Sequence, residues 1–343
     1  MNSSIKLMKP IMNVDFKSKT VLTDSAWEYV DLWLARGKLT GENQRDARLY
    51  WQQAKSFFDA SERLPINSKP LTAYYCCLNA VRALLVVHGK QMKNTTHGIS
   101  SNKSNLKSDE FSKEKIKIFD NGIFYDFLNF FGEEGIVNEK SPNSNNEFKF
   151  INVKDVFYNI ACIHRAYSLT YPDDEELFIP IKNVSLENDG ISEDEENILK
   201  FEVDKRYIAQ LPKKYSLKKT DDSSKYVPVR QSFSKSIETY YHALRKEMVY
   251  IQGDTTLWYL KSWQDDNDRV LKINDMALIM AGLHWMSELV RYNPTKFNDY
   301  RHSEVNWLLN EFIQQGFYQF VDEISCEITG HQILSTGHRG MLS

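Results

Sequence analysis

The apolar residues of this chain change their spacing twice along its length, and this constrains the fold more than any other feature. Between about residues 25 and 90, and again after about residue 275, apolar side chains recur every three or four positions, which is typical of amphipathic helices. After Tyr171-Pro172 the pattern alternates, which is typical of half-buried strands. The order predicts an α+β fold, predominantly helical, in which N- and C-terminal helices form one bundle with a small inserted β-sheet.

Three helices are predicted near the start of the chain, over residues 25–37, 44–64 and 71–88. Ser25 and Glu28 fit a capping box at the start of the first helix. Pro65 and Pro70 bracket a turn short enough to make the second and third helices antiparallel. We therefore expect the third helix to pack against the second and against helices from the last third of the chain.

The rest of the chain divides into a connection, short helices, strands and two final helices. The connection is the Ser/Asn/Lys-rich segment 90–118, and 141–146 is predicted to be an exposed loop. Short helices are predicted over 122–131 and 153–168, and strands over 176–187, 197–205, 224–233 and 247–253. A helix follows Met276, a long amphipathic helix runs from Val305 to Ile324, and 335–343 is expected to be a tail.

We accordingly expect a helical region over residues 20–170, a strand-rich insertion over 171–260, and C-terminal helices over 261–330 that pack on the first region. With 42% hydrophobic and 13% aromatic residues, a chain of 343 residues can bury a sizeable core, which excludes wholesale disorder. No leader-like apolar stretch stands at the N-terminus, and the most apolar window, 276–286, is short for a membrane span. We expect a cytoplasmic protein without a membrane partner.

The net charge and the spacing of the cysteines and histidines limit which partners and cofactors this chain is expected to bind. The 43 basic and 46 acidic residues give a net charge of −3, so any contact with nucleic acid must come from a local patch. One candidate is the segment 205–219, which has six basic residues and no acidic one; Lys213 and Lys214 are its candidate RNA-binding residues, although a solvated loop explains them equally. The four cysteines and eight histidines lack metal-ligand spacing, so no metal or other cofactor is expected.

The most informative stretch is KPLTAYYCCLNAVRALLVVHGKQMKNTTHG, residues 69–98. Tyr75, Asn79 and Arg82 follow one another by one helical turn and share a face. His88 lies about 120° from Arg82 around an ideal helix, so it joins that face only if the helix ends or bends near residue 87. Otherwise a second subunit must complete the site. His97, between TT and Gly98, is the alternative histidine.

These residue types suit the cleavage of RNA without a metal. An arginine binds phosphate oxygens with two nitrogens and stabilises negative charge that develops on phosphorus. A histidine moves protons near neutral pH. Structural explanations remain open: Arg82 can reach a surface carboxylate, His88 can be favoured by the helix C-terminus, and His97 can cap the next helix.

The run AYYCCLNAVRALLVVHG followed by TTHG resembles the HEPN superfamily. Many members of that superfamily are metal-independent ribonucleases that carry an arginine, four to six residues and then a histidine, and Arg82 and His88 fit this spacing. The resemblance implies catalysis by Arg82, His88 and Asn79 with His97 as a further candidate, RNA contact by Tyr75, and a homodimer. It also implies a toxin or effector of a bacterial anti-phage defence or stress system, with a protein partner from the same locus.

A second resemblance covers most of residues 45–325 as scattered blocks. The helix carrying Trp51, Ala54 and Phe58, the run KPLTAYYCCLNAVRALL, the segment HRAYSLTYP (164–172) and the segment WMSELVRYNPTKF (285–297) are similar to the YaaC-like bacterial family. This resemblance implies a fold and a kinship but no reaction. The alternative to an endoribonuclease is therefore a non-catalytic interaction or scaffold subunit of a defence complex.

Overall fold

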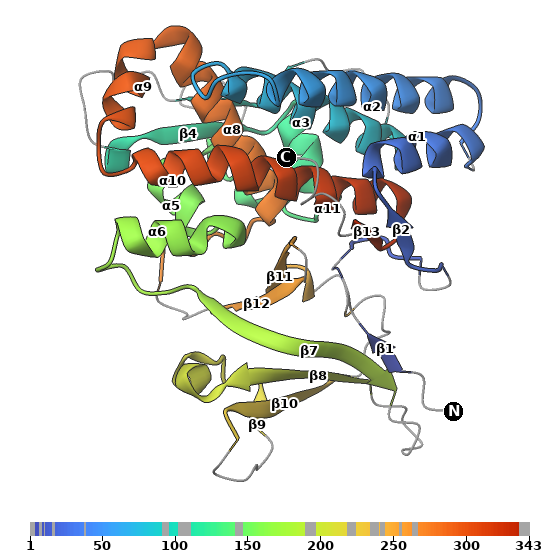
Figure 1. Ribbon diagram of the computed structural model, residues 1–343, viewed down its shortest axis with the longest axis vertical. Coiled ribbons are helices and arrows are strands. Elements are labelled where there is room, and N and C mark those ends of the chain that lie inside the picture. The colour runs from blue at the N-terminus through green and yellow to red at the C-terminus, as the bar shows by residue number, and fades with distance from the viewer. Residues whose placement is uncertain are drawn as a thin grey trace.

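The fold places a layer of helices above a large twisted sheet (Figure 1). The computed structural model describes residues 4–6, 9, 11–15, 18–37, 39–90, 96–101, 111–140, 147–188, 197–217, 224–233, 240, 244–253, 256–262 and 267–335. The predicted loop 141–146 and most of the predicted tail 335–343 lie outside these residues. The predicted α+β class is confirmed, with helices as the larger part.

The predicted N-terminal helices are confirmed, with α1 over Ala26–Arg36, α2 over Gly41–Ser61 and α3 over Lys69–Val87. Ser25 caps α1 because its side chain accepts a hydrogen bond from the backbone N–H of Glu28, 3.3 Å away. α3 packs against α2, α8 (Asp275–Tyr292) and α11 (Phe317–Thr329), as predicted. It is apolar and long enough to cross a membrane by length and composition, but 72% of its most apolar window is buried inside the fold, as in the core helix of a soluble protein.

The single helix predicted from Val305 to Ile324 is interrupted by a wider turn. α9 (Pro294–Arg301) and α10 (Asn306–Glu311) precede a π-helical segment, η6 (Phe312–Gly316), which continues into α11. The ring of Phe312 is fully buried where α8 has Gly282 and η6 has Gly316. Helix periodicity alone does not reveal a π turn, because the apolar residues on either side of it keep their helical spacing.

The predicted helix over 153–168 is broken into α5 (Val153–Tyr158), the 3₁₀ turn η4 (Ala161–Ile163) and α6 (His164–Thr170). Asn159 ends α5 because its buried side chain bonds to the chain near residue 270. Its amide donates to the carbonyl of Arg269 at 2.7 Å, and its oxygen accepts from the N–H of Leu271 at 2.8 Å. α4 (Ile123–Phe130) and the 3₁₀ turns η2 (Phe111–Lys113) and η3 (Glu134–Ile136) complete this part.

The inserted sheet is larger than predicted. In the described part it has seven strands in the order β11-β12-β7-β8-β10-β9, with β1 paired to β7, and all its neighbours run antiparallel. The four predicted strands are β7 (Phe178–Asn188), β8 (Asn197–Asp204), β10 (Tyr226–Phe233) and β11 (Met248–Ile251). Three of its strands were not predicted from the sequence: β1 (Ser4–Lys6), β9 (Ser216–Leu217) and β12 (Leu257–Lys261). The 3₁₀ turn η5 (Lys205–Gln210) follows β8.

Two further sheets were not predicted. β2 (Val21–Thr23) pairs in parallel with β13 (Ile333–Ser335), which joins the two ends of the helical layer. A four-stranded antiparallel sheet has the order β3-β4-β6-β5, formed by β3 (Ile99–Ser101), β4 (Lys115–Phe119), β5 (Glu139–Lys140) and β6 (Glu147–Asn152). Two of its strands lie in the segment expected to be a plain connection.

The buried residues form two cores, one within the helices and one within the large sheet. Between them lies a group of buried charges. Arg245 is 2% exposed and bonds to Glu323 at 2.6 Å and Glu327 at 3.3 Å, both on α11. Lys9 bonds to Asp322 at 2.7 Å, as does the hydroxyl of Tyr250 on β11. These contacts fasten the sheet to the last helix.

Candidate functional site

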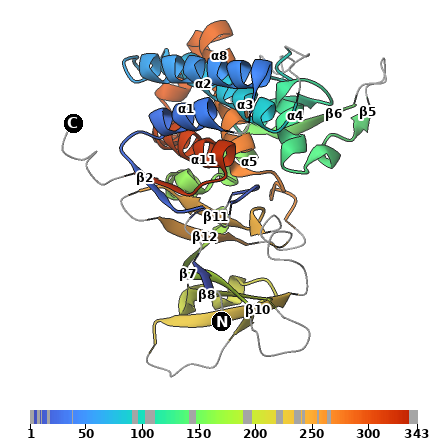
Figure 2. The same cartoon turned by 90° about the vertical axis from the view of Figure 1, so that its right-hand side faces the viewer.

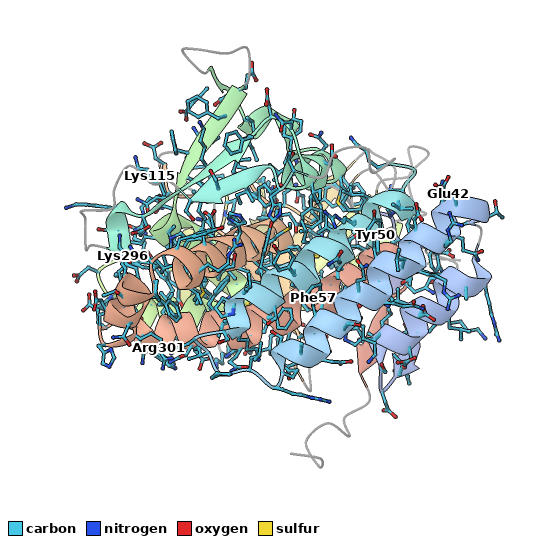
Figure 3. The ribbon with its side chains drawn as sticks, turned by 90° about the horizontal axis from the view of Figure 1, so that it is seen from above. Glu42, Tyr50, Phe57, Lys115, Lys296 and Arg301 are labelled. Carbon is cyan, nitrogen blue, oxygen red and sulfur yellow. The ribbon has the colours of Figure 1, made fainter. Side chains whose placement is uncertain are left out.

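The shared face of Tyr75, Asn79 and Arg82 lies opposite α2, as the helical spacing predicted. Between the two helices is a groove with a volume of about 530 Å³. α3 contributes those three side chains to it, and α2 contributes Gln53, Ser56, Phe57 and Ala60. Figure 3 shows α2 from above, with Tyr50 and Phe57 labelled along it.

Aromatic rings form much of this groove. The rings of Phe57 and Tyr75 are stacked, with centroids 5.5 Å apart and planes 24° apart. The Arg82 guanidinium lies 5.6 Å from the ring centroid of Tyr50 and within 3.5 Å of the side-chain oxygen of Asn79. Asn79 in turn donates to the Tyr75 carbonyl at 2.9 Å, so α3 holds the arginine at the edge of an aromatic surface.

His97 reaches this region from a tightly held turn. The first amides of α4 donate to the carbonyls of Thr96 and His97, each at 3.0 Å. Gly98 and Gly122 touch each other here, and both have positive φ, 76° and 96°. A Cβ on Gly98 would lie 2.5 Å from the carbonyl oxygen of Asn121, so the turn requires glycine.

The His97 ring lies beside Tyr74 of α3 and His284 of α8. Its Nδ1 lies 2.7 Å from the hydroxyl of Tyr74, and its ring centroid lies 6.0 Å from that of His284. His284 is 3% exposed, and its Nδ1 has no hydrogen-bond partner in the described part of the structure. Burial lowers the pKa of His284 to about 4, so this second ring is neutral at physiological pH.

Two arginines act on His97. Burial lowers its pKa, and the positive charges of Arg82 and Arg291 lower it further, while Glu288 opposes them. Arg82 comes from α3, whereas Arg291 and Glu288 come from α8. His284, Arg291 and Glu288 could not be predicted as neighbours of this site, because α8 lies some 200 residues further along the chain than α3 and no local pattern marks them.

His88 lies elsewhere. α3 ends at Val87 without a bend toward the groove, and His88 is its C-cap with φ −91° and ψ 20°. The His88 ring packs against Phe130 of α4, with centroids 4.9 Å apart. Burial lowers its pKa, and a hydrogen bond with the backbone of Glu327 opposes that shift. Within one chain the structure therefore brings Arg82 together with His97, while His88 faces α4 and α11.

The predicted basic patch is only partly free. The Lys214 ammonium is paired with the carboxylate of Glu247 and lies 5.2 Å from the ring centroid of Tyr215. Lys213 is exposed. Of the two lysines, Lys214 therefore already has an acidic partner, Glu247, which immediately precedes β11.

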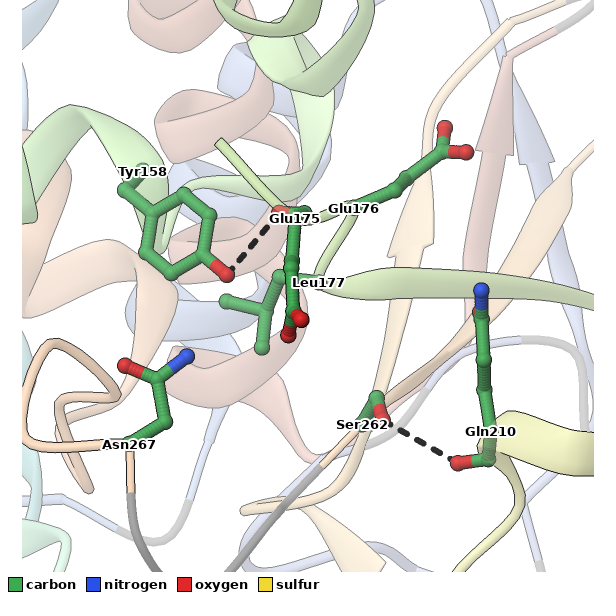
Figure 4. Close-up of a pocket in the computed structure, with 7 residues that line it drawn as sticks. All are labelled: Tyr158, Glu175, Glu176, Leu177, Gln210, Ser262 and Asn267. Carbon is green, nitrogen blue, oxygen red and sulfur yellow. Dashed lines mark hydrogen bonds between the residues drawn. The ribbon is translucent and has the colours of Figure 1, made fainter. Parts of the chain in front are cut away.

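A second pocket, of about 280 Å³, lies between the helices and the large sheet (Figure 4). The Tyr158 hydroxyl donates to the carbonyl of Glu175 at 3.0 Å, and the Ser262 hydroxyl donates to the carbonyl of Gln210 at 3.1 Å. The described residues that line it include two glutamates and no arginine, lysine or histidine: Tyr158, Glu175, Glu176, Leu177, Gln210, Ser262 and Asn267. It lacks the pairing of a cation with a histidine that distinguishes the first site.

The described residues contain no group of three His, Cys, Asp or Glu side chains arranged to hold a metal ion. All four cysteines are buried and free, as expected for small core residues: Cys76, Cys77, Cys162 and Cys326.

Comparison with known proteins gives one match. No curated protein and no solved structure is similar enough to this chain to be matched. A family model described as YaaC-like Protein matches residues 16–328, a span that includes the helical layer, the large sheet and the groove between α2 and α3. The chain therefore belongs to the YaaC-like family.

Proposed function

We propose that this protein is a metal-independent endoribonuclease, related to the HEPN superfamily, that acts in the bacterial cytoplasm in an anti-phage defence or stress system. The observation that carries the proposal is that Arg82 and Tyr75 line one aromatic groove and that the ring centroid of His97 lies 6.3 Å from that of Tyr75. The defence setting rests on the sequence resemblance around residues 69–98.

The groove offers two kinds of contact that single-stranded RNA uses. The stacked rings of Phe57 and Tyr75 present apolar surface on which a base can stack. Arg82 is fixed by Asn79 and Tyr50 at one side of them, where its fork suits the two free oxygens of a phosphodiester. A nucleotide with its base on Tyr75 thus has its phosphate near Arg82.

His97 supplies the proton chemistry in this scheme. Its lowered pKa keeps the imidazole neutral at physiological pH, so it can accept the proton of the ribose 2′-hydroxyl. The 2′-oxygen then forms a bond to the neighbouring phosphorus, and the bond from phosphorus to the 5′-oxygen breaks. That oxygen takes a proton from solvent, to which His97 afterwards returns the proton that it accepted. The products are a 2′,3′-cyclic phosphate and a 5′-hydroxyl. Arg82 stabilises the charge on the phosphoryl oxygens as it develops.

The test uses the purified full chain, an end-labelled RNA and a denaturing gel, with and without EDTA. We expect cleavage in both conditions, since the arginine and the histidine provide the charge and the proton transfer. Arg82→Ala and His97→Ala should each lower the rate on the order of 10²- to 10³-fold. Arg165→Ala and His302→Ala are matched controls, because both side chains are exposed and lie on other elements.

His88→Ala decides which histidine acts. Full activity of this variant supports His97 as the acid–base group within one chain. A loss equal to that of Arg82→Ala, with an unchanged melting temperature, would move the role to His88 and require a second subunit to bring it to Arg82. Neutralising Lys213 and Lys214 should weaken RNA binding modestly and reduce its salt dependence.

The second candidate function is a non-catalytic interaction or scaffold subunit. The same groove favours it, because Phe57, Ala60 and Tyr75 also suit the apolar face of a helix from a protein partner. In either case we propose a homodimer with α3 or its end near the interface, to be checked by light scattering at micromolar concentration. RNA left intact by the wild-type protein together with its natural partners would favour the scaffold.

A further inference from the structure

One face of the four-stranded sheet carries aromatic rings and lysines that neither core uses. In the pairing of β4 with β6, Lys117 lies across from Phe150, and Phe119 lies across from Phe148. Directly opposed residues in antiparallel strands point to the same side, and alternate residues share a face. These four side chains and Lys115 therefore lie on one face, which we call the aromatic–lysine face.

This face points away from the helical core. The intervening residues Ile116, Ile118 and Ile151 are at most 3% exposed and belong to that core. Phe119, Phe148 and Phe150 are half-buried and pack against neither core. Figure 2 shows β5 and β6 reaching outward past α4. The rings are not needed to fill the interior, so their presence at the surface calls for another explanation.

The lysine and the rings form a compact group. The Lys117 ammonium lies 4.2 Å from the ring centroid of Phe148, 5.0 Å from that of Phe119 and 5.7 Å from that of Phe150. The centroids of Phe148 and Phe150 are 5.4 Å apart. A cation among several rings gives the surface a positive charge while keeping flat apolar areas within reach of solvent.

The charge of this face suits a polyanion. Lys115, labelled in Figure 3, is exposed at the start of β4, two residues from Lys117. Glu139, which lies across from Phe148 on β5, is paired with Lys149 at 3.4 Å, so its charge is offset. Stacking rings beside lysines on an open antiparallel sheet are the elements with which proteins bind single-stranded nucleic acid.

We propose that the aromatic–lysine face binds single-stranded RNA, with bases on the phenylalanine rings and phosphates on Lys115 and Lys117. The choice of RNA rests on the proposed function. The sheet also connects this face to the candidate site, because Ser100 of β3 pairs with Lys117 and follows His97 by three residues. An RNA strand held on the sheet thus lies beside a strand that begins two residues after His97.

The experiment measures fluorescence anisotropy with the full chain and a labelled single-stranded 2′-O-methyl RNA of twelve nucleotides, which cannot be cleaved through its 2′-oxygen. The double variant Phe148→Ala/Phe150→Ala should weaken binding roughly 5- to 100-fold, because each substitution removes a ring on which a base can stack. Lys117→Gln, the milder change, should lower the slope of log K against log salt by about 0.7. The matched control is Lys182→Gln/Tyr226→Ala, which removes a lysine 3.5 Å from a ring centroid on the large sheet and should bind as the wild type does.

Three outcomes overturn this inference: unchanged binding in both variants, an equal loss in the control, or loss of a dimer in light scattering while RNA affinity stays the same. The last would make the face a protein interface. Arg82→Ala separates the two proposals, because it should abolish cleavage and still bind RNA on the sheet. If the wild type binds RNA and never cuts it, the proposed function fails and the binding face stands; if it cuts RNA without using this face, the reverse holds.

Discussion

Burial and the positive charges of two arginines lower the pKa of His97, so this histidine gives up its proton more easily than one in water. Arg82 and Arg291 approach it from two helices, and Glu288 offsets part of their effect. A phosphate bound near His97 neutralises this positive field, so substrate binding should bring its pKa back toward the ordinary value. In the reaction proposed above, His97 is therefore already unprotonated when RNA binds.

This electrostatic arrangement predicts a pH profile. The acid limb of kcat/KM for RNA cleavage reports the pKa of the base in the free enzyme, so it should lie below pH 6.5, the ordinary value for histidine. Arg291→Gln removes one of the two positive charges and should move this limb to higher pH. The measurement is cleavage rate from pH 4.5 to 8 at constant ionic strength.

Arg165→Gln serves as the control for this prediction, because Arg165 is exposed and paired with Glu176. Its acid limb should match that of the wild type. An unchanged limb in Arg291→Gln would mean that the titrating base is not His97.

The sequence predicted which residues lie together in the site only where those residues are close to one another in the chain. The shared face of Tyr75, Asn79 and Arg82 followed from helical spacing, and all three line one groove. The choice between His88 and His97 did not follow, because it depends on how α4 holds the turn at Gly98. Arg291 could not be predicted, since α8 meets α3 from a position about 200 residues further along the chain.

At the scale of elements, the close approach of α8 to the π-helical segment η6 shapes the helical core. The Phe312 ring is fully buried between Gly282 and Gly316 and lies tilted against the ring of Phe157, with ring centroids 4.5 Å apart. The extra residue of the π turn places this ring where α8 has no side chain. A glycine in mid-helix lowers helix stability, and here it allows two helices to pack around a phenylalanine.

Gly282→Ala should therefore destabilise the protein. A Cβ at this position would lie 2.6 Å from Cζ of Phe312, whose ring is fully buried, so the ring or the backbone must shift. Overpacking of this kind costs about 1–3 kcal/mol of unfolding free energy, which urea titration can measure. Gly135→Ala, where no atom lies within 4 Å of the new methyl group, should change little. Equal midpoints for the two variants would show that η6 yields to the added methyl group.

Element prediction succeeded for long periodic segments and failed for short strands. α1, α2 and α3 followed from caps, proline turns and apolar spacing, and β7, β8, β10 and β11 from alternation. β4 and β12 have five residues each, and their alternating pattern is too brief to separate from a loop. These segments form strands because of the strands they pair with. For β4 the partner is β6, about thirty residues further along the chain.

At the scale of the whole molecule, buried charges join the two cores. Glu133 precedes η3 and is 4% exposed, and its carboxylate accepts a hydrogen bond from the backbone of Asn274 at 3.2 Å. Burial raises its pKa to about 8, against the opposing charges of Lys246, Lys261 and Arg245. Burial likewise raises the pKa of Glu327 to about 7 and of Asp275 to about 6.

Raised carboxyl pKa values make the fold less stable as pH rises. The folded state holds these protons more tightly than the unfolded chain, so the stabilisation is complete below about pH 4.5 and is lost as pH rises through about 8. Glu133→Gln keeps an oxygen acceptor for Asn274 and cannot ionise. We expect the melting temperature of the wild type to fall between pH 6 and 9, and that of the variant to fall less.

The two melting temperatures must be compared at both ends of the pH range, because the histidines change stability with pH in the opposite direction to the carboxyl groups. The pKa values of His88, His97 and His284 are lowered, so acid below about pH 6.5 weakens the fold in both proteins. A variant that follows the wild type from pH 6 to 9 would show that Glu133 stays ionised in the native protein.

The pairing of β2 with β13 has a consequence for how the protein is made. Val21 pairs with Ile333, so this closure joins segments separated by most of the 343-residue chain. A ribosome adds about 5–20 residues per second, so on the order of tens of seconds pass between the synthesis of one strand and the other. During that interval α1, α2 and α3 exist without α8 and α11, with the apolar side of α3 uncovered. The uncovered side of α3 is apolar surface of the kind that chaperones bind, and it stays uncovered until α8 and α11 have been made.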